Sequence, residues 1–135
     1  MEAKAVKQRL QTHPETLPQL DDVSTCIAAT LNCAQSCATC ADACLAEEHS
    51  EGLARCIRLN LDCADVCELT GRMLSRQYEP QMQLLRGAIE LCSKACDVCA
   101  TECEAHAGTH EHCRLCAEAC RKCQQACNAL LAALA

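Results

Sequence analysis

Seventeen of the 135 residues are cysteines, and their spacing repeats along the chain. The pattern CxxxCxxCxxxC occurs three times, at Cys33, Cys37, Cys40 and Cys44, at Cys92, Cys96, Cys99 and Cys103, and at Cys116, Cys120, Cys123 and Cys127. A fourth copy has an asparagine in place of one cysteine and reads Cys56, Asn60, Cys63, Cys67. Cys26 and Cys113 extend the first and the last row toward the amino terminus. Spacings of three, four and seven are helical, so each row predicts one continuous stripe of sulfur along a helix.

These thiols are placed for metal binding rather than for disulfides. Residues four apart on a helix have Cβ atoms about 5 to 6 Å apart, whereas a disulfide requires about 3.8 Å. Two sulfurs at the wider spacing can hold a metal ion between them, and thiolate-only sites select Cu(I), Zn(II) or iron–sulfur clusters. A cysteine on an inner helix face is usually core, but seventeen small side chains in register would sacrifice much apolar burial.

Among these metals the pattern favours Cu(I). Structural zinc sites use four ligands, normally from paired cysteines on loops, and the ferredoxin run CxxCxxCxxxC is absent. Cu(I) accepts two or three soft ligands, so adjacent pairs along a helix suffice. One Cu(I) per thiolate also leaves a nearly neutral interior, whereas zinc with four thiolates leaves a double negative charge that is costly to bury. We therefore expect multiple Cu(I) ions per chain.

Histidines cluster at one predicted end of the sulfur stripes. The stretch HAGTHEHC contains His106, His110 and His112 beside Cys113, and we predict that all three histidines bind metal at the point where it enters. His49, near the turn after the first stripe, is a weaker candidate, and His13 lies outside the pattern.

Asn60 lies on the stripe of its helix, within the row of sulfurs. A buried amide needs hydrogen-bonding partners, so Asn60 either caps a polar network or offers a weak oxygen ligand to copper.

Four long helices and one short one are predicted to position these residues. Pro14, Pro18, Gly52, Pro80 and Gly108 interrupt a chain otherwise rich in good helix formers. Residues 1–20 are predicted to be an amphipathic amino-terminal segment containing a short helix, and residues 21–135 a cysteine-rich bundle. Its helices are expected at about 22–49, 53–77, 80–106 and 110–135, the first capped by Asp21, Asp22 or Ser24. The fold class is all-α, an antiparallel up-down-up-down four-helix bundle with a cysteine-lined core.

The two ends of that bundle are predicted to differ. One end is an apolar plug formed by Leu20, Val23, Leu74, Leu85, Ile89, Leu131 and Leu134. The other, the histidine end, gathers Cys44, His49, Cys56, Cys103, His106, His110, His112 and Cys113. We expect metal to enter at the histidine end.

Composition limits the partners and the compartment. The net charge is −6, with no basic cluster to neutralise phosphates, so nucleic acid is not expected as a partner. The first twenty residues are charged and contain no apolar run, which predicts neither a signal peptide nor a membrane span. We expect a cytoplasmic protein with reduced thiols and no membrane partner.

The motifs CAQSCATCADAC, GLARCIRLNLDCADVC, CSKACDVCATEC and THEHCRLCAEACRKCQQAC resemble those of the bacterial four-helix-bundle copper storage proteins, in particular their cytosolic branch. The resemblance covers roughly residues 21–130. It implies a homotetramer of bundles, each filled with Cu(I) held mainly by cysteine thiolates, with histidines at the open end. Copper donor or acceptor proteins are the further partners that such a store requires.

Three other hypotheses compete with copper storage. A metallothionein-like protein that sequesters zinc or cadmium would use the same thiolates. A thiol oxidoreductase would need one exposed cysteine of low pKa rather than seventeen inward ones, and we predict no enzyme activity. A bundle that merely uses cysteine as core filler would bind no metal.

Overall fold

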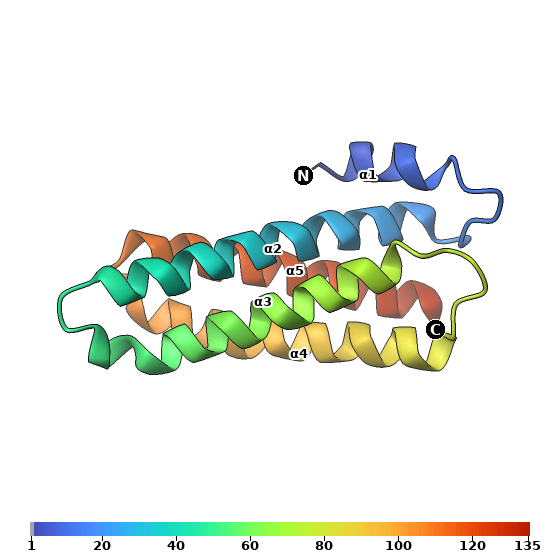
Figure 1. The fold of residues 1–135 in the computed structure, drawn as a ribbon. Coiled ribbons are helices and arrows are strands. Elements are labelled where there is room, and N and C mark those ends of the chain that lie inside the picture. The colour runs from blue at the N-terminus through green and yellow to red at the C-terminus, as the bar shows by residue number, and fades with distance from the viewer. Residues whose placement is uncertain (1) are drawn as a thin grey trace.

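The computed structural model describes residues 2–135, and all regular structure within them is helical (Figure 1). The α-helices are α1 (Ala3–Leu10), α2 (Leu20–Ala46), α3 (Ala54–Leu74), α4 (Met82–His106) and α5 (Glu111–Leu134), and a short 3₁₀ turn, η1 (Ser50–Leu53), precedes α3. Short loops join successive long helices, as expected for antiparallel neighbours.

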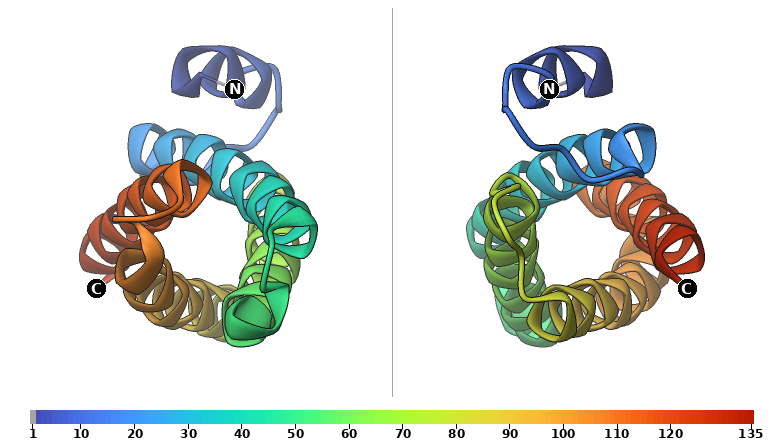
Figure 2. Two further views of the ribbon diagram at one scale, coloured as in Figure 1. Left: turned by 90° about the vertical axis from the view of Figure 1, so that its left-hand side faces the viewer. Right: turned by 90° about the vertical axis from the view of Figure 1, so that its right-hand side faces the viewer.

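Helices α2 to α5 form the predicted four-helix bundle. Each contacts two others, so that α2 packs against α3 and α5, and α4 packs against the same two helices. The end-on views show the four helices arranged around a common axis (Figure 2). Helix α1 lies outside this ring against α2, with Val6 and Leu10 buried. The fold class predicted from the cysteine spacing is therefore confirmed.

The predicted cap of the first long helix is wrong. Helix α2 begins at Leu20 after Gln19, whose side chain makes no capping hydrogen bond. Asp21 and Asp22 lie within the first turn, where their charges face the positive end of the helix dipole. The Ser24 hydroxyl donates to the Leu20 carbonyl at 2.7 Å, inside the helix. The acidic residues therefore stabilise this start electrostatically rather than as caps.

The apolar plug forms where predicted, with one difference in α5. Val23, Leu74, Leu85 and Ile89 are buried, whereas Leu20, Leu131 and Leu134 are only partly buried. Leu130 is the α5 leucine that is completely buried. The sequence pattern thus located the plug but named Leu131 and Leu134 in α5 and omitted Leu130.

Gln77 ties the amino-terminal connection to this plug. It was expected at the end of a helix, but α3 ends at Leu74 and Gln77 lies in the loop before α4. Its side-chain oxygen accepts the Leu17 N–H at 2.9 Å, and its amide nitrogen donates to the Leu74 carbonyl at 2.9 Å. The plug end is therefore closed by a polar contact as well as by apolar packing.

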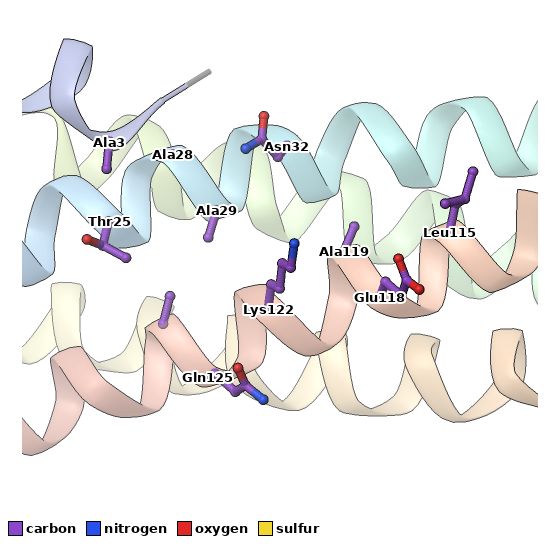
Figure 3. A pocket seen from close by; sticks show the side chains of 11 residues that line it. Ala3, Thr25, Ala28, Ala29, Asn32, Leu115, Glu118, Ala119, Lys122 and Gln125 are labelled. Atoms are coloured by element: carbon purple, nitrogen blue, oxygen red, sulfur yellow. The ribbon is translucent and has the colours of Figure 1, made fainter.

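The outer surface offers a groove between α2 and α5 that lies apart from the sulfurs. Thr25, Ala28 and Ala29 line it from α2, and Ala119 and Lys122 from α5 (Figure 3). No cysteine lines this groove. Among residues 2–135, none of the helices has the length and apolar character needed to cross a membrane.

Candidate metal centre

All seventeen cysteines are buried as free thiols and fill the centre of the bundle. We call this set of sulfurs the sulfur column. Neighbouring sulfurs lie about 3.6 to 4.0 Å apart, as in the pairs Cys33–Cys120 and Cys67–Cys123. A disulfide has sulfurs about 2.05 Å apart, so these are not bonded pairs. If each metal–sulfur bond is about 2.3 Å long, as in zinc sites, two sulfurs at this spacing can bind one ion with a sulfur–metal–sulfur angle of roughly 100 to 120°.

The sulfur column begins next to the apolar plug. Cys26 and Cys127 face each other across α2 and α5, with their sulfurs 3.8 Å apart. The next group, whose sulfurs all lie within 4.8 Å of one another, consists of Cys67, Cys92, Cys96 and Cys123. Three helices contribute to this group, so the bundle itself brings its ligands together.

Successive groups share their sulfurs along the middle of the column. Three further quartets with the same mutual spacing are Cys33, Cys63, Cys67 and Cys96; Cys33, Cys37, Cys63 and Cys120; and Cys37, Cys99, Cys116 and Cys120. Cys33, for example, belongs to two of them. A sulfur that belongs to two groups can bridge two metal ions, so the geometry suits linked clusters better than separate mononuclear sites.

Asn60 occupies the position in α3 where the repeat lacks a cysteine, and its side chain is fully buried among sulfurs. Its carbonyl oxygen accepts S–H bonds from Cys99 at 3.0 Å, Cys116 at 3.3 Å and Cys103 at 3.5 Å. Its amide nitrogen donates to the Cys56 sulfur at 3.7 Å. The Asn60 amide therefore forms a hydrogen-bond network with four cysteines, which is one of the two roles expected from the sequence. Its oxygen also lies close enough to three of these sulfurs to contact an ion that they bind.

The column ends in a mixed group of three thiols and one imidazole. Cys40, Cys44, His112 and Cys113 have ligand atoms within 4.8 Å of one another. The Nδ1 atom of His112 lies 3.4 Å from the Cys40 sulfur and 3.6 Å from the Cys113 sulfur. Of the histidines predicted as ligands, His112 is thus the one brought directly to the sulfurs.

The other predicted histidines at this end are held by carboxylates. His110 stacks on His112 with ring centroids 5.4 Å apart, and its Nδ1 lies 3.1 Å from a Glu47 oxygen. The Nε2 atom of His106 lies 2.8 Å from Glu102, whose other oxygen pairs with Arg55 at 3.3 Å.

The two weaker candidates lie away from the sulfur column. His49 is in the left-handed region at the α2–η1 turn, is exposed, and pairs with Glu51 at 3.6 Å. His13 accepts the backbone N–H of Glu15 in the exposed amino-terminal connection. Neither position suits a ligand of the sulfur column.

Burial raises the pKa of two thiols at the histidine end. It is the largest cause that raises the pKa of Cys113 from 9.0 to about 12, and repulsion from Cys56 and Cys44 adds to it. Burial, followed by repulsion from Cys56, likewise raises the pKa of Cys44. These thiols are therefore protonated at neutral pH, and a metal ion that binds them must displace protons.

Glu47 and Glu102 are the site residues that sequence reasoning missed. Glu102 precedes His106 by four residues on α4, so the pair could have been read from helical spacing. Glu47 follows α2 and is separated from His110 and His112 by more than sixty residues. Only the antiparallel topology brings it to them.

A four-helix bundle with a continuous column of buried thiols is a protein built to bind soft metal ions. The family model described as copper storage protein matches residues 19–132, so the chain belongs to the copper storage protein family. The resemblance noted in the cysteine motifs is thereby confirmed.

Solved structures agree with this assignment. The copper storage protein Ccsp from Streptomyces lividans, loaded with 10 copper equivalents, is 46% identical, with a TM-score of 0.92 over 94% of this chain and 98% of that chain. The Cu(I)-bound copper storage protein BsCsp3 is 34% identical, with a TM-score of 0.68 over 80% of this chain and 96% of that chain.

A curated relative gives a partial match. The uncharacterized cysteine-rich protein YhjQ of Bacillus subtilis (strain 168) is 35% identical over 67 residues. The match spans 50% of this chain and 62% of that relative's length.

Proposed function

We propose that this protein binds and stores many Cu(I) ions in the sulfur column, on the order of one per cysteine. The observation that carries the proposal is the sharing of sulfurs between successive quartets, in which Cys33, Cys37, Cys63, Cys67, Cys96 and Cys120 each belong to two groups. Bridging thiolates let seventeen sulfurs hold many ions of low coordination number. Four exclusive ligands per ion would instead limit the chain to about four ions.

The charge of the interior supports Cu(I) over Zn(II). Among residues 2–135, the buried polar residues are Ser24, Thr30, Asn60, Thr70 and Gln77, so no lysine or arginine is available inside to balance excess thiolate charge. One Cu(I) per thiolate neutralises the column, whereas zinc thiolate sites retain negative charge in a buried environment. The metallothionein-like alternative is therefore not favoured.

The ligands follow from the arrangement. The seventeen cysteines provide the thiolates, His112 provides Nδ1 at the histidine end, and Asn60 provides a weak oxygen contact within the column. His110 and His106 bind copper transiently as it enters and are not ligands of the stored ions. The storage role requires no catalytic turnover.

The setting of the store is part of the proposal. A Streptomyces lividans relative that is 49% identical, with a TM-score of 0.82, is described as a cytosolic copper storage protein, and we propose the same compartment for this chain. We also propose a homotetramer of bundles that exchanges copper with donor or acceptor proteins.

Competition between metals tests this function. Reduced metal-free protein is mixed anaerobically with equal concentrations of Cu(I) and Zn(II), desalted and analysed for both metals. Copper storage predicts many Cu(I) and almost no zinc per chain. Retention of zinc in preference to copper would favour a metallothionein-like, zinc-sequestering protein. Retention of neither metal would indicate that the cysteines only fill the core.

A further inference from the structure

One carboxylate contacts both histidines at the open end of the sulfur column. Glu47 follows the last turn of α2, and its two oxygens face two different rings of the α5 start. Oε2 lies 3.1 Å from Nδ1 of His110, and Oε1 lies 3.6 Å from Nε2 of His112. All three side chains are largely shielded, with 22%, 21% and 36% of the His110, His112 and Glu47 side chains exposed. A shielded carboxylate between two imidazoles restricts the orientation of both.

The two nitrogens of His112 face opposite kinds of partner. Nδ1 faces the sulfurs of Cys40 and Cys113, at 3.4 and 3.6 Å. Nε2 is buried and has no hydrogen-bond partner among residues 2–135, and Glu47 approaches it at a distance slightly too long for a hydrogen bond. A small rotation of either side chain closes this gap, as is common when a site tightens on binding its ligand.

The chemistry of the carboxylate decides which nitrogen carries the proton. An ionised carboxylate can only accept hydrogen bonds, and a neutral imidazole has one N–H and one lone pair. The nitrogen that faces Glu47 is therefore the N–H in each ring, which is Nε2 in His112 and Nδ1 in His110. The lone pair of His112 then lies on Nδ1 and points at the thiols.

We propose that Glu47 is a positioning residue that holds His112 in the Nε2–H form, with Nδ1 presented to the sulfur column as a copper ligand. The same carboxylate holds His110 in the opposite form, which leaves the lone pair of His110 on Nε2. The two stacked rings are thus held in opposite forms by a single residue, Glu47, which directly follows α2. This inference rests on the proposed copper-binding function, but its first consequence concerns the metal-free protein.

The size of the effect follows from other metal sites. Partners that hold the second nitrogen of a metal-binding imidazole typically contribute about 10- to 100-fold to metal affinity. We expect Glu47→Gln to weaken the copper bound at His112 by about this factor, because an amide can donate as well as accept and no longer selects one form. The thiolates remain, so the total number of copper ions bound should not change.

The first test measures the histidine rings without metal. In the reduced, ¹⁵N-labelled full chain, long-range ¹H–¹⁵N correlation spectra distinguish the two neutral forms of each imidazole. We expect Nε2–H for His112 and Nδ1–H for His110 in the parent protein, and mixtures in Glu47→Gln. Glu48→Gln, which neutralises the adjacent exposed carboxylate, is the matched control and should leave both rings unchanged. Identical spectra for Glu47→Gln and the parent, or a parent His112 protonated on Nδ1, would overturn the proposal.

The second test measures copper at this position. Cu(I) is titrated against a chromophoric chelator while the His112 ring signals report when the copper at the histidine end binds. A loss of affinity of about 10-fold or more at that step in Glu47→Gln, but not in Glu48→Gln, supports the positioning role. Altered rings with unchanged affinity would overturn it. If the parent binds no copper at all, the storage function fails, and the metal-free spectra still decide whether Glu47 sets the two rings.

Discussion

Raising the pH is expected to tighten copper binding at the histidine end well beyond the range in which an ordinary thiol responds. The Cys113 thiol has its pKa raised from 9.0 to about 12, chiefly by burial, and the pKa of Cys44 is raised for the same reason. Copper binds the thiolate, so each ion must displace a proton from these groups.

The magnitude follows from this shift. A rise of about three pKa units makes the Cys113 thiolate about a thousand times rarer than that of an ordinary cysteine at neutral pH. Because the thiol stays protonated until about pH 12, release of one proton per copper raises the affinity about tenfold for each pH unit across that whole range. For a thiol with the ordinary pKa of 9.0, the increase would level off above that value.

The assay is chelator competition for Cu(I) from about pH 7 to about pH 10.5, corrected for protonation of the chelator, with proton release followed in weakly buffered solution. We expect about one proton per copper and a steady rise in affinity throughout. Levelling of the affinity near pH 9, or copper uptake without proton release, would show that the thiolates exist before copper arrives and would refute the reasoning.

Three further predictions concern the fold and the two ends of the bundle. Circular dichroism should show a helical protein before copper is added, because helix propensity and the plug do not depend on metal, and a coil-to-helix change on loading would contradict this. Replacing His106, His110 and His112 together with non-ligating residues should slow copper uptake in stopped-flow measurements but lower the copper capacity by only a few ions. The control is Leu130→Ala, which should lower the free energy of unfolding by about 2 to 5 kcal/mol without slowing copper uptake. Slower uptake in the control alone would place the entrance at the plug. Asn60→Cys completes the fourth repeat, so metal analysis should find about one additional copper per chain. Thermal melts should show a less stable metal-free protein, because the four hydrogen bonds between the Asn60 amide and cysteine thiols are lost.

The bundle and its sulfur column could be predicted because a single local rule determines them. Cysteines three and four residues apart share one helix face, so rows such as Cys33 to Cys44 define the inward face without knowledge of any partner. The breakers around Gly52, Pro80 and Gly108 then set the number of helices and their antiparallel order. His112 directly precedes Cys113, so its place beside the last sulfurs could be predicted as well.

The rest depends on contacts between distant segments. The pairing of Glu47 with the two histidines arises because the turn after α2 meets the start of α5, and neither segment contains a pattern that identifies its partner. Leu130 rather than Leu131 is fully buried in the plug, and the two positions differ by about 100° of helix rotation, which packing rather than composition decides. The predicted cap at Asp21, Asp22 or Ser24 is wrong because acidic residues are favourable both at a cap and in the first turn, and these positions differ by only a few residues.

The central claim is that the thiols form one shared column for Cu(I), and counting the copper tests it most directly. Reduced metal-free protein is titrated with Cu(I) under anaerobic conditions, and the equivalents bound per chain are measured after removal of excess metal. Sharing of thiolates predicts saturation on the order of 17 Cu(I) per chain, with a few more if the histidines also bind. Saturation at about four ions per chain would contradict the account, because it would mean that the cysteines form separate four-ligand sites.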